Sequence, residues 1–125
     1  MNKIIHTENA PAAIGPYSQA LRTGNMMFVS GQIPIDPATG LMAEDVKAQA
    51  TQSLTNLKNI LEAEGLTMKN VIKTTVFLSD LADFAAVNEV YATFFEAPYP
   101  ARSCVEVCAI PKGAKVEIEC IAVVD

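Results

Sequence analysis

The chain has 125 residues, of which half are apolar and only 18% are charged, compared with about 25% charged residues in an average soluble domain. Nine basic residues stand against fourteen acidic ones, and this balance argues against a nucleic-acid partner because phosphate binding depends on clustered Lys and Arg. No apolar run reaches the ~18 residues that indicate a membrane span, and the N-terminus lacks the apolar core of a signal peptide. We therefore expect one cytoplasmic domain over residues 1–125, with no membrane or nucleic-acid partner.

The apolar content bears on the oligomeric state. The mean hydropathy is +0.24, and a domain of this size hides a large apolar surface with difficulty. Exposed apolar patches commonly mark an interface. Self-association and an apolar-rich monomer are both consistent with the composition.

The three cysteines and the single histidine do not have the spacing of a metal site. An odd number of cysteines without a secretion signal indicates free thiols in a reducing compartment, and zinc needs four good ligands. His6 lies far along the chain from all three cysteines, so a Cys-His nucleophile is not expected. We expect Cys108 and Cys120 to fill the core, as Cys104 can also do.

The N-terminal half of the chain predicts three strands and one helix. Residues 9–16, rich in Pro, Ala and Gly, form a loop after the first strand, and Thr23-Gly24-Asn25 is a hairpin turn between the next two. Farther on, apolar residues recur every three or four positions, as on one face of an amphipathic helix, and Gly65 is its natural end. The predicted elements are strands at 3–6, 18–22 and 26–30 and a helix at 44–64.

The C-terminal half predicts a strand, a second helix and two further strands. The strand at 70–79 is expected to be buried on both sides for part of its length. Asp80 is a good N-cap for the second helix, which ends before Pro98 and presents an apolar face of Phe84, Val87, Tyr91 and Phe94. The final strands are predicted at 103–108 and 116–122, and local signals alone favour a hairpin between them.

These final strands alternate apolar and polar residues, which is the period of a half-buried strand. In the first, Arg102, Cys104 and Glu106 share a face; in the second, Glu117 and Glu119 lie opposite a face of apolar residues. An arginine just before the start of a strand can bind a carboxylate through two parallel hydrogen bonds. A glutamate on a neighbouring strand can orient or deprotonate water. The simpler interpretation places these charges on a solvated face of a sheet.

Five segments, in the same order along nearly the whole chain, resemble the RidA (YjgF) family of reactive intermediate deaminases. Together they are highly specific, although each alone would be a weak signal. The segments are NAPAAIGPYSQ (9–19), SGQIP (30–34), KTTVFL (73–78), VNEVY (87–91) and PARSCVEV (100–107).

The resemblance implies a chorismate-mutase-like α+β fold of the bacillus type, in the order β-β-β-α-β-α-β-β. It has a six-stranded mixed sheet with two helices on one face. In this fold the strand at 70–79 lies between the final two strands, so these do not form a hairpin.

The resemblance also implies an activity: hydrolysis of 2-aminoacrylate-type enamines and imines derived from amino acids, giving 2-oxo acids and ammonia. It further implies a homotrimer with sites between subunits, and no metal or cofactor. One alternative is a non-catalytic regulatory or chaperone-like protein that binds a small carboxylate. Another is an RNA-directed inhibitor or nuclease, which the acidic balance and the lack of catalytic histidines disfavour.

Catalytic roles are implied for Arg102, Glu119 and Tyr17. Arg102 matches the arginine that binds the substrate carboxylate, Glu119 the glutamate that positions the attacking water, and Tyr17 an aromatic residue that lines the pocket. The implied substrate-binding positions, besides Arg102, are Ser103, Cys104, Gly31, Ser30 and Asn88.

Most of these positions also have a purely structural interpretation. Tyr17 can cover an edge of the core, Gly31 can permit a tight turn, and Asn88 can be a surface residue of a helix. Glu119 can pair with Lys115 or Lys73. Arg102 is the strongest candidate, because an arginine is costly to bury without an anionic partner.

Overall fold

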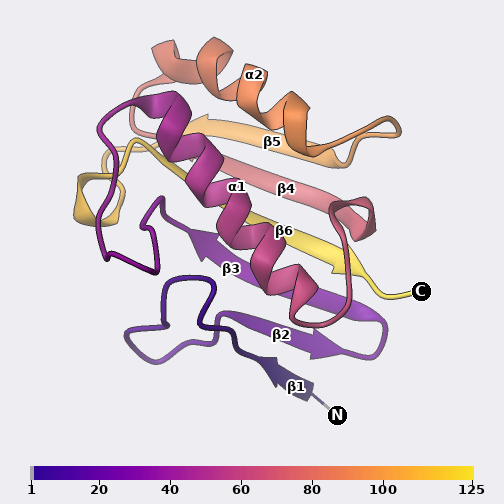
Figure 1. Cartoon of the computed structure of the whole chain (residues 1–125). Helices are drawn as coiled ribbons and strands as arrows, with labels where there is room; N and C mark the ends of the chain where they lie inside the picture. The colour runs from indigo at the N-terminus through magenta and orange to yellow at the C-terminus, as the bar shows by residue number, and fades with distance from the viewer. Residues whose placement is uncertain (1) are drawn as a thin grey trace.

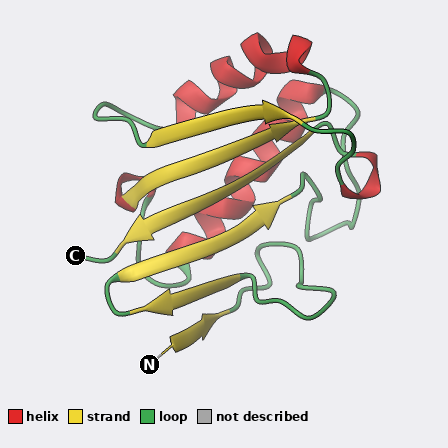
Figure 2. Ribbon diagram, turned by 180° about the vertical axis from the view of Figure 1, so that it is seen from behind, coloured by secondary structure: helices red, strands yellow, loops and turns green. Residues whose placement is uncertain are grey.

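In the computed structural model, which describes residues 2–125, six strands form one mixed sheet and two α-helices cover one of its faces (Figure 1). Seen from behind, the other face carries no helix (Figure 2). The predicted α+β architecture is therefore confirmed. The elements are β1 (Asn2–Ile5), β2 (Ala20–Thr23), β3 (Met26–Gln32), α1 (Val46–Glu62), β4 (Val71–Leu78), α2 (Phe84–Phe94), β5 (Ala101–Glu106) and β6 (Val116–Val123), with 3-10 turns η1 (Met68–Asn70), η2 (Leu81–Asp83) and η3 (Pro111–Gly113).

The strands are ordered β1-β2-β3-β6-β4-β5 across the sheet. β4 pairs with β5 in parallel and with β6 in antiparallel orientation, so Val76 has Cys104 on one side and Ile118 on the other. The hairpin favoured by local signals is wrong, and the arrangement implied by the family resemblance is confirmed. The physical reason is the α2 crossover, which returns the chain parallel to β4 and thereby occupies the edge of β4 that β6 does not use.

Helix α1 forms where the apolar periodicity predicts it, two residues shorter at each end. Its buried face includes Ala50, Leu54, Leu57 and Leu61, and it packs against α2, β6 and β3. Asp45 caps the first turn, because its side chain accepts a hydrogen bond from the Ala48 amide at 3.0 Å.

The start of the second helix differs from the prediction. Asp80 accepts a hydrogen bond from the Ala82 amide at 2.9 Å, but it caps η2 and not an α-helix. The α-helix begins only at Phe84, after that 3-10 turn. Val87 and Tyr91 are buried as expected, whereas Phe84 stays 38% exposed.

β5 begins at Ala101, two residues before its predicted start, because its parallel pairing with β4 begins there, opposite Lys73. Arg102 is therefore part of the strand and does not precede it. The expectation that β4 is buried on both sides is wrong for this chain. Val76 and Leu78 are covered on the helical side, but Ile72 remains 45% exposed.

The helix-free side of the sheet, called here the open face, is rich in apolar side chains. The register aligns Ile4, Leu21, Phe28 and Ile121 along it. Ile4 is 67% and Phe28 is 44% exposed. The chain therefore leaves a sheet face of apolar character uncovered, as the composition suggests.

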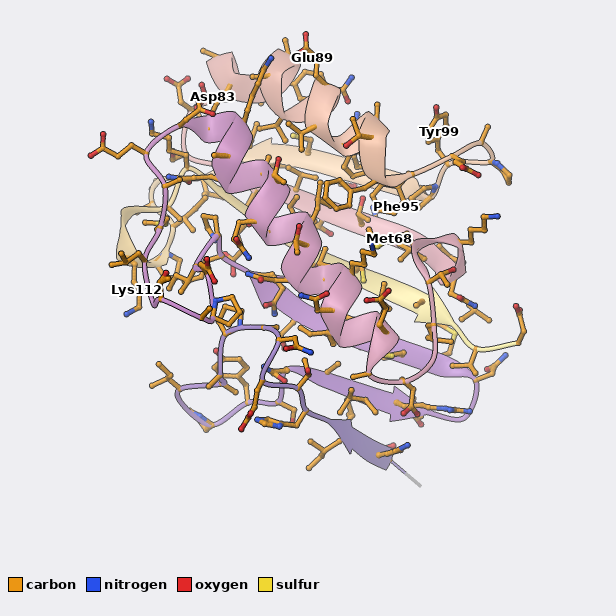
Figure 3. All side chains as sticks on the ribbon, in the orientation of Figure 1. Met68, Asp83, Glu89, Phe95, Tyr99 and Lys112 are labelled. Carbon is orange, nitrogen blue, oxygen red and sulfur yellow. The ribbon has the colours of Figure 1, made fainter. Side chains whose placement is uncertain are left out.

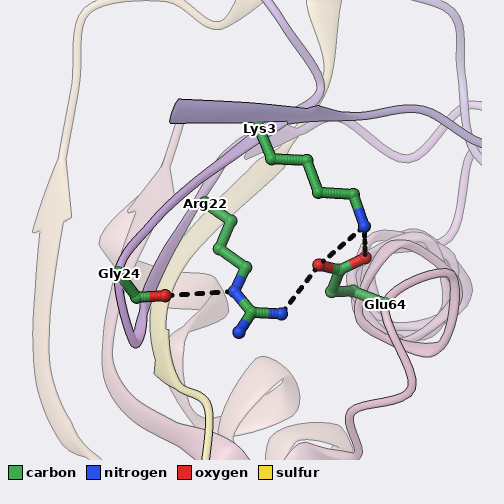
Figure 4. Close-up of polar contacts among 4 residues, drawn as sticks. All are labelled: Lys3, Arg22, Gly24 and Glu64. Carbon is green, nitrogen blue, oxygen red and sulfur yellow. Dashed lines mark hydrogen bonds and ion pairs between the residues drawn. The ribbon is translucent and has the colours of Figure 1, made fainter. Parts of the chain in front are cut away.

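An ion-pair cluster ties the first two strands to the end of α1 (Figure 4). Lys3 Nζ and Arg22 Nη1 lie 2.8 and 3.0 Å from the two carboxylate oxygens of Glu64. The Glu64 side chain is only 7% exposed, and these hydrogen bonds hold the pKa of its carboxyl below the ordinary value. Among residues 2–125, no helix is long and apolar enough to cross a membrane.

Candidate functional site

Arg102 lies on edge strand β5 and extends over the inner side of α2. Its guanidinium carbon is 4.7 Å from the ring centroid of Tyr91 and 5.4 Å from that of Phe84, both within cation–π range. Its Nη1 donates a hydrogen bond of 2.8 Å to Asn88 Oδ1. The helix therefore orients the guanidinium through one amide oxygen and two aromatic rings.

No carboxylate pairs with Arg102 among the described residues. The guanidinium borders a hollow of about 430 Å³ lined also by Asn88, Tyr91, Ala92, Tyr99 and Pro100. Tyr99 belongs to the loop between α2 and β5 (Figure 3). An oriented guanidinium without an anionic partner at the wall of a hollow is suited to bind a carboxylate through its remaining N–H groups.

The residues beneath Arg102 are buried and in contact with one another. The Tyr91 hydroxyl shares a hydrogen bond of 2.7 Å with Thr74 Oγ1, and the Tyr91 ring lies 4.5 Å from that of Phe95, centroid to centroid. Burial raises the pKa of the Tyr91 phenol, which therefore stays neutral. The sequence pattern identified Tyr91 only as a core residue; its place one helical turn after Asn88 is the signal for a second role.

Glu119 lies near the middle of β6 on the open face, opposite an irregularity in β3. Val29 pairs with Cys120 and Gln32 with Ile118, so Ser30 and Gly31 together stand opposite Glu119 alone. This is the geometry of a β-bulge, which redirects side chains at a strand end. Glu119 is exposed and lines a hollow of about 400 Å³ with Ser18, Leu21, Phe28, Ser30 and neighbouring residues.

The loop that carries Tyr17 is held beside the bulge. Gln19 is 2% exposed; its side chain bonds to the Thr7 amide and to the carbonyls of Thr7, Ala10 and Pro11. Ser30 Oγ donates 2.6 Å to the Ser18 carbonyl. Tyr17 remains 55% exposed and lines, with Gly31, a third hollow of about 540 Å³.

Ser103 and Cys104 follow Arg102 on β5 and point to different sides. Ser103 Oγ accepts a hydrogen bond of 2.8 Å from Lys73 Nζ. Cys104 packs against the core, and burial raises the pKa of its thiol, an effect that nearby Arg102 opposes. Buried Cys120 has a pKa raised to about 12. Cys108 is exposed, so its predicted place in the core is wrong: β5 ends two residues before it.

The structure groups the candidate residues into two clusters on opposite sides of the sheet. Thr74 pairs with Arg102 and Cys120, whereas Thr75 pairs with Ser103 and Glu119. Because adjacent residues of a strand point to opposite faces, Arg102 faces the helices while Glu119 faces away from them. Two strand spacings, about 10 Å, also separate their strands. One chain does not direct both side chains at the same small molecule.

Lys73 and Lys115, the two partners suggested for Glu119, both bond to other groups. Lys73 Nζ bonds to Ser103, and Lys115 Nζ donates 2.7 Å to the Glu44 carbonyl. Within the described residues Glu119 forms no ion pair. Nor do His, Cys, Asp and Glu side chains there gather in threes as metal ligands would.

Glu117 is a carboxylate whose position the sequence pattern does not distinguish from that of Glu119. Both face away from the core, yet Glu117 is half-buried and its side chain covers Gly31. A Cβ on residue 31 would fall 2.9 Å from Glu117 Cδ and nearer still to Oε2. Glycine at position 31 therefore accommodates a carboxyl group.

The comparisons with known proteins identify the family of the chain. The family described as Endoribonuclease L-PSP matches residues 7–124. The chain belongs to this family, which is the RidA (YjgF) family of the sequence motifs. The 2-iminobutanoate/2-iminopropanoate deaminase of Salmonella typhimurium is 60% identical, with 98% of each chain covered.

The fold of the chain also matches solved structures of other family members. The YjgF gene product from Escherichia coli superposes with a TM-score of 0.94 at 58% identity, covering 97% of this chain and 98% of that one. Escherichia coli TdcF with bound serine gives a TM-score of 0.95 at 54% identity, covering 98% and 99%. The RidA fold here thus matches that of a relative that binds a small amino acid.

Proposed function

We propose that this chain hydrolyses reactive 2-aminoacrylate-type enamines, through their imine tautomers, to 2-oxo acids and ammonia. The observation that carries the proposal is the oriented guanidinium of Arg102, which borders a hollow and has no anionic partner among the described residues. Support comes from relatives named as imine deaminases at about 60% identity over nearly their whole length. Arg102 would bind the carboxylate that all these substrates share.

The chemistry requires one base and little else. Glu119 would take a proton from water as the water oxygen bonds to the imine carbon, and the π electrons of the C=N bond would move to nitrogen. The nitrogen then accepts that proton, which gives a carbinolamine with one hydroxyl and one amino group. The hydroxyl proton passes through Glu119 to the amino nitrogen as the C–N bond breaks, so that ammonia leaves and the 2-oxo group forms. Proton transfer by one positioned carboxylate typically accelerates such a step about 100- to 10,000-fold.

The remaining candidate residues would shape the pocket. Tyr17 would form an aromatic wall, and Ser30, Gly31 and the backbone of Ser103 and Cys104 would offer hydrogen bonds to the ligand. Asn88 would orient Arg102 in the free protein. No resident metal or cofactor has a part in this scheme, because an imine carbon is already electrophilic.

A complete site requires two copies of the chain, and we infer a homotrimer with sites at its subunit borders. Arg102 and Glu119 lie on opposite faces of the sheet, so the Arg102 of one copy would meet the Glu119 of the next. The apolar open face, with Ile4 and Phe28 exposed, supplies a surface for burial between copies. We also propose a cytoplasmic location, which the three free cysteines support because thiols persist in a reducing compartment.

Two other functions make different predictions. A regulator that only senses a small carboxylate would use the same Arg102 hollow without turnover; one relative has been solved with serine bound. A ribonuclease, the activity in the family description, would need a basic surface, whereas this chain carries a net charge of −5.

The deciding experiment measures ammonia release from an imine generated in situ by an amino-acid oxidase, with and without the protein. A deaminase accelerates the release above the spontaneous rate. A sensor binds pyruvate in calorimetry and leaves the spontaneous rate unchanged. A nuclease cleaves single-stranded RNA under conditions in which the imine is untouched.

A further inference from the structure

The hollow of about 540 Å³ that Tyr17 and Gly31 line, called here the Tyr17 hollow, lies between two segments that are far apart in the sequence. One wall is the loop that follows β1, and the other is the segment that follows β3. Its size and its apolar lining suit the side chain of a ligand whose polar end is bound elsewhere. The apolar residues of the two walls include Ala10, Pro11, Ile14, Ile33, Ile35 and Pro37.

Asn56 of α1 holds the wall that follows β3. Its Nδ2 donates hydrogen bonds of 3.2 and 3.0 Å to the carbonyls of Ile33 and Ile35, and its Oδ1 accepts one of 2.8 Å from Gln52 Nε2. The Ile35 amide also donates to the Ile33 carbonyl at 2.9 Å, so this part of the wall is a tight turn. Because Asn56 is fully buried, loss of its amide leaves buried polar groups without their partners.

Asn59, one turn farther along α1, holds the opposite wall. Its Nδ2 donates a hydrogen bond of 2.8 Å to the carbonyl of Asn9, which follows Glu8 and precedes Ala10, both of which line the hollow. The buried amide of Gln19 bonds to the Ala10 carbonyl at 3.3 Å. The loop after β1 is therefore fixed from the helix on one side and from the start of β2 on the other.

We propose that Asn56 and Asn59 form a clamp that fixes the distance between the walls of the Tyr17 hollow, and thereby determine which substrate side chains the site accepts. Residues three apart on a helix lie on one face, so one helix holds both walls. The inference rests on the proposed function: with the substrate carboxylate on Arg102 of a neighbouring copy, the Tyr17 hollow is left for the side chain. Both asparagines are positioning residues, since they act through the walls.

The same face of α1 provides matched controls. Gln49 is 3% exposed and bonds in a similar way, to the Ala43 carbonyl at 2.7 Å and the Lys115 amide at 2.8 Å. Neither of these two partners lines the Tyr17 hollow. Ser53 is fully buried, and its hydroxyl has no hydrogen-bond partner among the described residues. Gln49→Ala therefore removes a buried amide without releasing a wall, and Ser53→Ala removes no bond at all.

The primary test measures binding and needs no turnover. Calorimetry with the full-length protein gives the Kd values of pyruvate and phenylpyruvate, which share the 2-oxo acid group and differ in side-chain size. One methylene in a close-fitting pocket changes discrimination by about tenfold or more. The ratio of the phenylpyruvate Kd to the pyruvate Kd should therefore fall by about threefold or more in Asn56→Ala and Asn59→Ala, because separated walls admit the larger ring. Asn59→Gln should restore the wild-type ratio, since its longer amide reaches the same carbonyl.

The controls decide between a clamp and a general loss of stability. Gln49→Ala and Ser53→Ala should keep the wild-type ratio of Kd values, even where Gln49→Ala lowers the midpoint of thermal unfolding. An unchanged ratio in both clamp variants, or the same shift in Gln49→Ala, overturns the proposal. If Asn56→Ala does not fold, Asn59→Ala and its rescue by Asn59→Gln decide.

A second arm separates the clamp from the proposed function. The ratio of kcat/KM for the imine of phenylalanine to that for the imine of alanine should rise in the clamp variants and stay constant in the controls. Ammonia release absent from wild type that still binds both acids refutes the deaminase and leaves the Kd ratios to judge the clamp. If wild type binds neither acid, the clamp is overturned as a determinant of substrate choice, together with the role of Arg102.

Discussion

The two clusters of candidate residues are built on different principles. The Arg102 cluster has a cation held by an amide and two aromatic rings, over a buried hydroxyl pair. The Glu119 cluster has a bulged strand, a pair of carboxyl groups and a hydrogen-bonded loop, with no cation paired to Glu119. The first is suited to recognise an anion and the second to activate water.

The difference is the reason that we propose a site shared between two copies of the chain. Strand β4 lies between β5 and β6, and its neighbouring residues 74 and 75 pair with Arg102 and Glu119, respectively. Arg102 and Glu119 therefore face opposite sides of the sheet. A second copy that brings its own Glu119 cluster to the Arg102 edge resolves the conflict. The following experiments separate the two clusters.

Glu119→Gln is expected to have the largest effect, a loss of ammonia release of about 100-fold or more, because an amide is not a base at neutral pH. Pyruvate binding should persist, since Arg102 is untouched. Stopped-flow ammonia detection and calorimetry measure the two properties. Wild-type turnover in this variant would place the base elsewhere.

Arg102→Lys should lower kcat/KM by about tenfold or more and weaken pyruvate binding, although the charge is kept. An ammonium lacks the planar fork that binds a carboxylate in two places. Asn88→Ala, which removes the hydrogen bond to Nη1, should have a smaller effect, mainly on KM. Unchanged binding in Arg102→Lys, with the native assembly intact by light scattering, would show that the arginine is structural.

Mixing the two impaired variants in equal amounts tests whether the clusters meet between copies. If sites form between neighbouring subunits, random assembly of Arg102→Lys with Glu119→Gln gives about one quarter of the sites an intact Arg102 and an intact Glu119. Activity should therefore return to about a quarter of wild type after joint refolding or co-expression. No recovery in mixed assemblies confirmed by native mass spectrometry would contradict an intersubunit site.

The Glu64 cluster lies away from both groups, and its effect should be the smallest. The pKa of Glu64 is lowered in the folded state, so it contributes stability above its unfolded pKa and loses that contribution as the pH falls through the folded value. Glu64→Gln should reduce the free energy of unfolding at pH 7 by about 1 kcal/mol or less, and by a smaller amount at pH 4, below the ordinary pKa of 4.5. Urea titrations at both pH values measure it, and ammonia release should be unaffected.

Local patterns predicted much of the fold because they depend on neighbouring residues alone. The period of α1 follows from Ala50, Leu54, Leu57 and Leu61, and Gly65 ends the helix region with a φ of 75°. The alternation in β6 correctly separated its buried face from Glu117 and Glu119. The sequence also predicted that Asp80 caps a helix. It did not predict that this helix is a 3-10 turn.

The site was predicted residue by residue only through the family motifs. From the residues alone, Arg102 and Glu119 were charges on strands, with solvent exposure as the simpler interpretation. The positions of Tyr91 and Glu117 beside the candidate residues were missed because they depend on contacts across elements: Tyr91 with Arg102 and Thr74, and Glu117 with Gly31. No pattern within one strand encodes such contacts.

The sequence by itself determined which residues of α1 and β6 face the core, since that depends on the periods of helix and strand. Only the tertiary structure decided that β4 separates β5 from β6, that β3 bulges opposite Glu119, and that Arg102 and Glu119 face opposite sides. Strand order and register follow from pairings between segments tens of residues apart. Local propensity carries no information about those pairings, because their energy comes from backbone hydrogen bonds and packing made only once the whole sheet is assembled.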